Sequence, residues 1–392
     1  MAINLILATN YNLKTDILKD GEEQRMVENT YAPMLDFFSD LGVKSNHFPV
    51  GLTLETLATQ HEDVIQKMKT LKNKGIVEFG SHTFAHPIVP ITPYQDMTRQ
   101  IAYDIKLHES ILGHKPRGFY PPEFTYDATL PKILHLHEIE WVMLLNNNVV
   151  GTYGSTIKDT FGVGQVTGIE NTLLPCVFVY GDEKLELKTE IFKTFEAKTS
   201  PADFVKYFWQ KLENDGGLAD DALVILYFDI EAPYFALTEY NVSPQKHMQK
   251  ALELIYSRND VRSIHISEAI KMFAPQKTFT PLPFVTFKPF SLWTEGSEKL
   301  DTLLNEARRK IGIAEAVCKD DPRLVNAWRD LMIAEGSDAR IAVSKRRQQG
   351  IPFDSGIRHG NMSRVIENYE YAIKARQIAE DVVKENHTIC KA

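Results

Sequence analysis

Two carboxylic acids of this sequence each follow a short apolar run with the composition of a β-strand. Glu123 follows Gly118-Phe-Tyr-Pro-Pro, and Asp229 follows Leu223-Val-Ile-Leu-Tyr-Phe. Because the carboxyl ends of parallel strands meet at one edge of an α/β fold, we expect both side chains to face one cleft. Two carboxyl groups in a cleft can work as acid and base, or as nucleophile and acid.

The neighbours of Glu123 indicate what such a pair would act on. Tyr120, Phe124 and Tyr126 flank it, and flat aromatic faces suit stacking against a sugar ring. The structural alternative is that Glu123 caps the helix that follows. Asp127 is better placed for that capping role, because it lies closer to the next helical segment.

Asp229 is followed two positions later by a second carboxylate, Glu231. The two-residue period of a strand places both side chains on the same side. A charge at the end of a buried strand is costly unless it is paired or used. A buried salt bridge or a helix cap is therefore the structural alternative to a catalytic Asp229 with Glu231 as a substrate contact.

Two histidines follow another expected strand, in the sequence Gly80-Ser-His82-Thr-Phe-Ala-His86-Pro. Histidines four positions apart in such a loop can present both imidazoles to one pocket, where they would bind sugar hydroxyls or hold a metal ion. The structural alternative is that one caps a helix and the other hydrogen-bonds to the backbone. Trp293 and Asp338 are weaker candidates, since tryptophan is more often core and Asp338 could cap a helix.

Short strands alternating with helices must position these residues. Apolar runs at Ile3–Leu7, Ile76–Phe79, Trp141–Leu145 and Leu223–Phe228 alternate with segments of helical period such as Glu55–Leu71 and Met97–Leu112. Such alternation predicts an α/β fold with a parallel sheet or barrel.

The chain divides into a body and a tail. We expect a barrel-forming domain over residues 1–275, with an insertion of loops and short strands near 146–198, where glycines are frequent. Residues 276–290 are rich in proline and predict an extended linker. Residues 291–392 contain helical segments with no strand between them, which predicts an all-helical C-terminal domain.

The composition excludes several classes of function. Lys and Arg number 44 against 52 Asp and Glu, and this net charge of −8 argues against nucleic acid as a partner. Cys176, Cys318 and Cys390 are too few and too scattered for a disulfide framework.

We find no basic leader and no run of about 18 apolar residues, so we expect a soluble, cytoplasmic protein without a membrane partner. P-loop, GxGxxG and GxSxG motifs are absent, which weakens nucleotide-dependent and serine-hydrolase functions.

The order of these motifs resembles glycoside hydrolase family 57, a set of retaining α-glucan enzymes. The similar stretches are Glu78-Phe-Gly-Ser-His82-Thr-Phe-Ala-His86-Pro-Ile-Val-Pro, Tyr120-Pro-Pro-Glu123, Phe228-Asp229-Ile-Glu231 and Trp328…Ser337-Asp338. The resemblance implies an incomplete (β/α)7 barrel followed by an all-helical domain. It places Glu123 at the nucleophile position and Asp229 at the general acid/base position, with His82 or His86 as a substrate-side histidine. Neither a metal nor a cofactor is required by that mechanism.

Two departures from the family pattern concern the same cleft. The family opens with His-Gln-Pro after its first strand, where this chain has Asn10-Tyr11-Asn12. Asn10 can hydrogen-bond a sugar hydroxyl but cannot carry a proton. The aromatic-rich stretch after the acid is reduced to Pro233-Tyr234-Phe235. One alternative is therefore a catalytically inactive carbohydrate-binding homologue, although a binding module has no need of two carboxylates facing one cleft.

A further alternative rests on the same histidines. The spacing from His82 to His86 also resembles the His-x3-His zinc motif of polysaccharide deacetylases, and Phe119-Tyr-Pro-Pro122 resembles their substrate groove. Those enzymes need a pair of strand-1 aspartates to complete the metal site and supply the base. Residues Leu5 to Asn12 contain no aspartate, and Asp16 is the nearest. The sequence therefore favours the glycosidase.

The expected reaction is double displacement on an α-glucan or maltooligosaccharide, of the amylase or 4-α-glucanotransferase type. Retaining enzymes hold their carboxyl groups about 5–5.5 Å apart and separate the two pKa values. Water and sugar acceptors share the covalent intermediate, so hydrolysis and transfer both stay open, as does the oligomeric state. The predicted substrate contacts are Asn10, His82, His86, Tyr120, Phe124, Tyr126, Glu231, Trp293 and Asp338.

Overall fold

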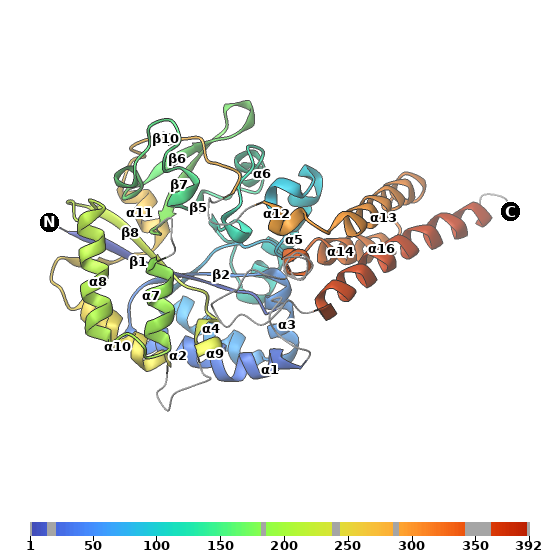
Figure 1. Ribbon diagram of the computed structural model, residues 1–392. Coiled ribbons are helices and arrows are strands. Elements are labelled where there is room, and N and C mark those ends of the chain that lie inside the picture. The colour runs from blue at the N-terminus through green and yellow to red at the C-terminus, as the bar shows by residue number, and fades with distance from the viewer. Residues whose placement is uncertain are drawn as a thin grey trace.

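A sheet of mostly parallel strands forms the centre of the protein, and a group of long helices extends from one side of it (Figure 1). This computed structural model describes residues 2–13, 21–181, 186–236, 244–284, 290–341 and 362–389. Asp16 and Cys390 lie outside the described residues. The predicted α/β class with helices at the C-terminal end is confirmed.

Parallel strands surround the apolar centre of the body. Those of the main circuit are β1 (Ile3–Tyr11), β2 (Ser45–Pro49), β3 (Val77–Phe79), β4 (Gly118–Phe119), β5 (Trp141–Leu145), β7 (Leu173–Val179) and β8 (Ala222–Tyr227). Their pairing runs β3-β2-β1-β8-β7-β5-β4. A parallel bridge between Ser81 and Phe119 then joins β4 to the chain just after β3. This circuit is consistent with the predicted (β/α)7 barrel.

The strands are buried on both faces, which is why they form continuous apolar runs in the sequence. Ile6 and Ala8 of β1 join Ile225 of β8 in the apolar cluster that fills the interior. Leu5 and Leu7 point the other way and pack in the cluster formed with the surrounding helices. The period of two along each strand therefore separates the interior of the circuit from its helical coat.

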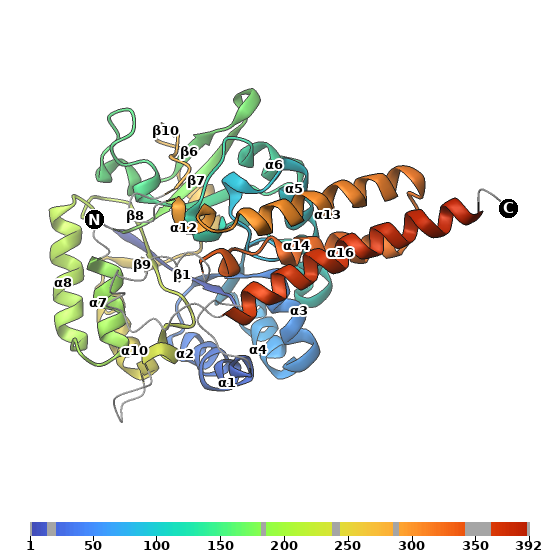
Figure 2. The same ribbon diagram turned by 45° about the vertical axis from the view of Figure 1, so that its right-hand side comes forward.

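Helices cover the outside of the sheet. Those of the body are α1 (Glu22–Met26), α2 (Ala32–Leu41), α3 (Gly51–Gln60), α4 (Glu62–Asn73), α5 (Tyr94–Leu107), α6 (Leu130–Leu136), α7 (Glu186–Phe195), α8 (Pro201–Asn214), α9 (Ala232–Ala236), α10 (Pro244–Tyr256) and α11 (Ile266–Met272). Of these, α7, α8 and α10 pack together on one side of the sheet (Figure 2). The single helix expected over Glu55–Leu71 is instead broken at His61, whose φ of −141° lies outside the helical range.

The segment expected as an insertion contributes to the main sheet. Its strand β7 pairs in parallel with β5 and β8, whereas β6 (Gly164–Thr167) is antiparallel to β7. The antiparallel strand β6 thus precedes β7, whereas a helix precedes most other strands of the circuit. The alternation of strands and helices is therefore not visible in this part of the sequence. In the expected linker, β10 (Thr278–Phe279) pairs with β6, and just before that linker β9 (Val261–Ser263) pairs with β1.

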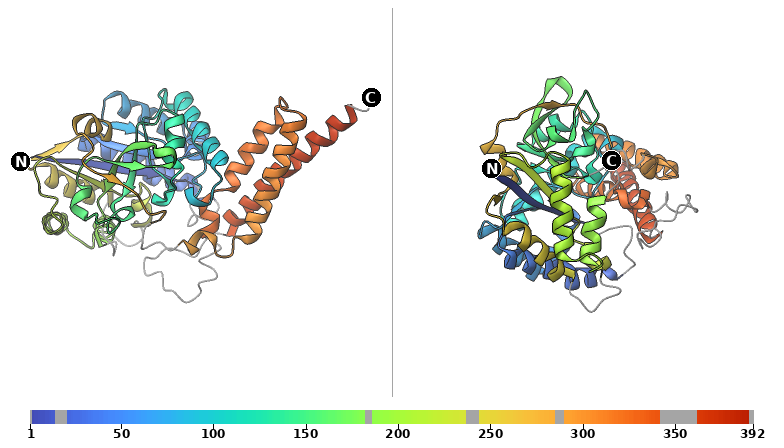
Figure 3. Two further views of the ribbon diagram at one scale, coloured as in Figure 1. Left: turned by 90° about the horizontal axis from the view of Figure 1, so that it is seen from above. Right: turned by 60° about the vertical axis from the view of Figure 1, so that its left-hand side comes forward.

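The C-terminal region is helical, as predicted. It contains α12 (Ser291–Thr294), α13 (Glu298–Val317), α14 (Arg323–Ala334) and α16 (Met362–Ile389). The last three pack around one apolar cluster and point away from the α/β body (Figure 3). None of the described helices combines the length and the hydropathy needed to cross a membrane.

Candidate active site

Asp229, just after β8, is held by two groups that favour its charged form. One carboxylate oxygen accepts a hydrogen bond from the Tyr227 hydroxyl over 2.7 Å. The other lies 3.2 Å from Nζ of Lys188, a residue of α7, and 31% of the Asp229 side chain is exposed. A hydroxyl donor and an ammonium both stabilise a carboxylate over the protonated acid. Asp229 is therefore a paired carboxyl group that is partly open to solvent.

The hydroxyl of Tyr227 connects Asp229 to two further polar groups. It lies 2.8 Å from Oδ1 of Asn10 and 3.3 Å from the hydroxyl of Tyr120. Burial raises the pKa of both tyrosines well above its ordinary value, and the nearby Asp229 adds to the effect. Each hydroxyl keeps its single proton, so Tyr227 can donate to Asp229 or to Asn10, but not to both at once.

Glu123 lies in a turn with left-handed backbone. Its φ is 56°, and that of Phe124 is 54°. The turn is closed by hydrogen bonds from Phe124 N–H to the Pro121 carbonyl and from Thr125 N–H to the Pro122 carbonyl, each over 3.0 Å. Residues other than glycine rarely adopt this conformation, and such strained positions are concentrated at functional sites.

Glu123 and Asp229 share neighbours. The charge of Asp229 raises the pKa of the Lys188 ammonium, and the charge of Glu123 adds a smaller effect. Both carboxylates also add to the effect of burial in raising the pKa of Tyr120. The ends of β4 and β8 therefore bring the two acidic side chains into electrostatic range of the same groups.

His82 offers a hydrogen-bond acceptor beside these carboxylates. Its ring stacks on Tyr120 with centroids 4.2 Å apart and an interplanar angle of 7°. Nδ1 lies 2.7 Å from the Tyr120 carbonyl. A carbonyl can only accept, so Nδ1 carries the proton and Nε2 has a free lone pair. Nε2 is buried without a partner among the described residues. Burial lowers the pKa of His82 well below its ordinary value, with His86 adding to the effect, so the ring is neutral.

The helical region meets the body beside this loop. The His86 ring lies 4.8 Å from that of His82, centroid to centroid. His86 Nδ1 is 2.8 Å from Ser337 Oγ, and Ser337 N–H donates to the His86 carbonyl over 3.0 Å. Asn12 Nδ2 donates to Asp338 over 3.0 Å. Ser337 and Asp338, which follow α14, therefore bind the loop after β3 and the loop after β1.

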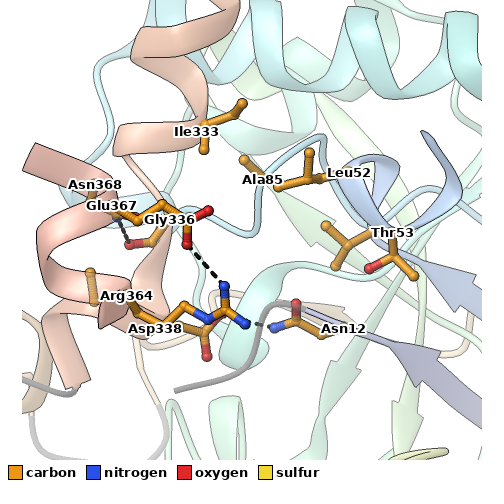
Figure 4. A pocket seen from close by; sticks show the side chains of 12 residues that line it. Asn12, Leu52, Thr53, Ala85, Ile333, Gly336, Asp338, Arg364, Glu367 and Asn368 are labelled. Carbon is orange, nitrogen blue, oxygen red and sulfur yellow. Dashed lines mark hydrogen bonds and ion pairs between the residues drawn. The ribbon is translucent and has the colours of Figure 1, made fainter. Parts of the chain in front are cut away.

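A small pocket of about 40 Å³ lies at this junction. Figure 4 shows Asn12 and Asp338 directed toward one another, with Arg364 of α16 beside them. Arg364 Nη1 donates to Glu367 over 2.9 Å. The pocket is lined from both regions, by Asn12, Val50, Leu52, Thr53, Ala85, Ile333, Gly336, Asp338, Ala339, Arg364, Glu367 and Asn368.

The family model of glycosyl hydrolase family 57 matches residues 7–283. The chain belongs to this family. An α-amylase of Dictyoglomus thermophilum is 30% identical over 144 residues, which are 36% of this chain and 20% of the amylase. A chitin deacetylase of Saccharomyces cerevisiae is 28% identical over 116 residues, which are 27% of this chain and 35% of the deacetylase. The matched segments thus span about a fifth and a third of these curated relatives.

A solved family 57 branching enzyme of Pyrococcus horikoshii shares the fold. It superposes with a TM-score of 0.70 at 14% identity, and the alignment covers 98% of this chain and 94% of that chain. The agreement includes the helical region, since nearly all of this chain is aligned.

Glu231 is not exposed in this family 57 chain. Its side chain is 3% exposed, and its carboxylate accepts hydrogen bonds from Asn12 N–H over 2.8 Å and from the Tyr31 hydroxyl over 2.5 Å. Burial raises the pKa of Glu231 to about 8, and the charge of Asp229 contributes. We therefore correct the expected substrate contact: Glu231 ties the loop after β1 to the loop after β8.

The predicted aromatic contacts separate into two groups. Phe124 packs against Tyr120 and Tyr227, with ring centroids 4.6 and 5.3 Å away, so it belongs to the group around Asp229. Tyr126 instead donates its hydroxyl to the Thr167 carbonyl over 3.0 Å and packs in a separate apolar cluster. Trp293 is 1% exposed and so has no free face for stacking. Both are corrected from substrate contacts to core residues.

Sequence reasoning missed Tyr227 and Lys188. Tyr227 stands two positions before Asp229, so the period of two along β8 could have placed it on the same side. Lys188 belongs to a helix that the sequence placed within an insertion, and its local sequence carries no signal for this contact.

Proposed function

We propose that this family 57 chain is a retaining α-glucan-active enzyme, a hydrolase or transglycosylase of the amylase or 4-α-glucanotransferase type. One observation carries the proposal: Glu123 and Asp229, from two strand ends, lie within electrostatic range of one ammonium, that of Lys188. Both carboxylates are only partly buried, so a ligand can reach them. The substrate proposed is a maltooligosaccharide or a longer α-glucan.

The reaction proposed is a double displacement. A carboxylate oxygen of Glu123 bonds to the anomeric carbon, the bond from that carbon to the glycosidic oxygen breaks, and Asp229 gives its proton to the departing oxygen. Water or a sugar hydroxyl then attacks the anomeric carbon and releases Glu123, while Asp229 takes the proton of the attacking group. The same chemistry serves hydrolysis and transfer.

Uncharged groups around the carboxylates would orient the sugar. His82 Nε2 has a lone pair without a partner among the described residues, but its ring is 0% exposed, so this structure does not present it to a sugar hydroxyl. The amide of Asn10 and the hydroxyl of Tyr227 can exchange their mutual hydrogen bond for bonds to the substrate. Tyr120 and Phe124 pack against each other on the same side and are 3% and 7% exposed, so they support these groups from below.

Chromatography of the products from a maltooligosaccharide panel tests the proposal. Shorter products with new reducing ends indicate hydrolysis, and redistributed chain lengths indicate transfer. Glu123→Gln should lower turnover by at least about 10³-fold, because the amide cannot form the covalent intermediate. Turnover that survives this substitution would overturn the assignment of Glu123.

Glu170 provides a matched control. It is also a glutamate with left-handed backbone, with φ 55°, but its side chain is 68% exposed and pairs with Lys132 at the surface. Glu170→Gln should leave turnover within about twofold of the wild type. Equal losses in the two variants would indicate a general defect rather than a lost nucleophile.

A polysaccharide deacetylase is the second candidate, favoured by the match to the chitin deacetylase and by the adjacent rings of His82 and His86. Zinc in such an enzyme needs a third protein ligand besides two histidines. The end of β1 supplies the amides of Asn10 and Asn12, which contact Tyr227 and Asp338. Within the described ranges, no three His, Cys, Asp or Glu side chains are grouped to hold a metal ion. These residues do not fit a zinc site.

Acetate release separates the two candidates. Acetylated chitooligosaccharides are incubated with the protein in the presence of added zinc and of a chelator. We expect no acetate in either sample. Zinc-dependent release of acetate without cleavage of maltooligosaccharides would overturn the glycosidase proposal.

A further inference from the structure

Lys188 has no part in the reaction as written above, yet it contacts Asp229. Its Nζ lies 3.2 Å from Asp229 Oδ2, and its side chain is 39% exposed. Glu123 also raises the pKa of this ammonium. Lys188 comes from α7, which packs against α8, α9 and α10 and whose buried side chains share an apolar cluster with Leu226 of β8.

The two half-reactions place one negative charge on different carboxylates. Before the first step, Glu123 must be ionised and Asp229 must be protonated. In the covalent intermediate, Glu123 is an uncharged ester and Asp229 is the carboxylate that accepts the next proton. A permanent positive charge within range of both acids balances the negative charge in each of these states.

We propose that Lys188 is a positioning residue of this reaction, whose ammonium is the counter-ion of Glu123 in the first half-reaction and of Asp229 in the second. This inference rests on the proposed glycosidase function. The ammonium keeps its proton throughout, and no bond to it forms or breaks. It acts by stabilising the charged form of each carboxylate in turn.

Four described neighbours of the two acids carry no positive charge. Tyr227 and Tyr120 are neutral hydroxyls near Asp229, since burial raises the pKa of both. His82, beside Glu123, is neutral because burial lowers its pKa. Glu231, with its pKa raised by burial to about 8, is a neutral acid at pH 7. Lys188 differs from all of them in carrying a positive charge.

The pH dependence of kcat/KM tests the role of Lys188. The acid limb reports ionisation of Glu123, and the alkaline limb reports deprotonation of Asp229. Removing the ammonium makes both carboxyl groups harder to ionise. In Lys188→Gln we therefore expect both limbs to move to higher pH by about one unit, so that the whole bell shifts. Lys188→Arg, which keeps the charge, should restore the wild-type position of the limbs.

Lys193 supplies the matched control on the same helix. It pairs with Glu190 at 2.6 Å, away from the site, and Lys193→Gln should leave both limbs in place. A purely structural role of Lys188 would lower the height of the bell without moving it. Limbs that stay in place in Lys188→Gln would overturn the inference.

A second measurement does not depend on turnover. Carboxyl carbon NMR of protein labelled in aspartate follows the titration of Asp229, whose signal is identified by its loss in Asp229→Asn. The midpoint should rise by about one pH unit in Lys188→Gln and return in Lys188→Arg. An unchanged midpoint would overturn the inference. If no sample cleaves or redistributes maltooligosaccharides at any pH, the proposed function fails, and this titration still decides whether Lys188 controls Asp229.

Discussion

Among the places where the described residues gather two acids around one cation, the candidate active site and the seam between body and helical region differ in burial. At the candidate active site, Lys188 is 39% exposed and its partner Asp229 is 31% exposed. At the seam between body and helical region, Arg308 of α13 contacts Asp96 of α5 and Glu335 after α14. The side chains of these two acids are 2% and 4% exposed.

The two acids of the seam are buried and well supplied with hydrogen bonds, and Arg308 is 22% exposed. Arg308 contacts Asp96 through Nε and Glu335 through Nη2, the latter over 2.9 Å. Gln100 Nε2 donates to Glu335 over 3.1 Å and to the Met332 carbonyl over 2.9 Å. Burial raises the pKa of Glu335 to about 8, and the neighbouring Asp96 adds to this effect. Near pH 7 the seam therefore contains a neutral acid beside an arginine–carboxylate pair.

The two sites differ in the burial of their acids and in the kind of cation that pairs with them. The planar guanidinium of Arg308 holds two acids in fixed positions, as arginine does at buried ion pairs. The ammonium of Lys188 is a point charge on a flexible stem in contact with water, so its partner can change during a reaction. A cation with two acids is thus held rigidly at the seam, whereas the cation of the candidate active site has room to move.

The largest effect should follow from breaking the seam. Arg308→Met leaves the buried Asp96 carboxylate without its closest cation and should lower the free energy of unfolding by about 3–5 kcal/mol. Denaturant unfolding followed by circular dichroism measures this. Arg323 is the matched control, because it also pairs with two acids, Asp321 and Glu385, at the surface. Arg323→Met should cost less than about 1 kcal/mol, and equal costs would contradict the comparison.

A smaller effect should appear in the pH dependence of stability. The pKa of Glu335 is raised to about 8 in the folded protein, so the folded state binds this proton more tightly than the unfolded state does. The resulting stability is fully present below the unfolded pKa and is lost as pH rises through the folded pKa. Between pH 5 and pH 8 the wild type should lose about 2–4 kcal/mol relative to Glu335→Gln. Parallel pH profiles of unfolding for the two proteins would show that Glu335 does not hold this proton.

The smallest effect should come from the lysine of the active site. Lys188→Met removes a partly exposed ion pair, and such pairs contribute about 0–1 kcal/mol. We expect the unfolding free energy to change by less than about 1 kcal/mol, measured in the same buffer as for Arg308→Met. A loss as large as that of Arg308→Met would make Lys188 a structural residue and remove the contrast between the two regions.

Most elements could be predicted where one periodicity dominates a segment. The strand expected over Trp141–Leu145 coincides with β5, and the all-helical region expected over residues 291–392 contains α13, a helix of 20 residues. The break at His61 could not be predicted, because apolar residues keep a helical period on both sides of it. The place of β7 in the main sheet was also hidden, since strand pairing joins residues distant in sequence and leaves no local pattern.

Around the candidate site, strand-end reasoning selected Glu123 and Asp229 but misplaced some of their neighbours. Tyr126 and Trp293 have the residue types of sugar-stacking surfaces, yet Tyr126 packs in an apolar cluster and Trp293 is 1% exposed. Residue type is the same for an aromatic ring in a cleft and one in a core, and only packing distinguishes them. Glu231 stands two positions after Asp229, as the strand period requires for a shared side. Its carboxylate nevertheless accepts hydrogen bonds in the interior, from the Tyr31 hydroxyl and from Asn12 N–H.

The sequence by itself determined the family 57 motifs, the α/β class, the helical C-terminal region and the two acids at strand ends. These follow from local patterns and from the rule that parallel strands present their carboxyl ends at one edge. Only the tertiary structure decided which cation meets Asp229 and which acids meet Arg308. The reason is physical: side chains of similar surface helices become distinct only when packing brings one of them, such as Lys188 of α7, within a few ångströms of a charge elsewhere in the chain.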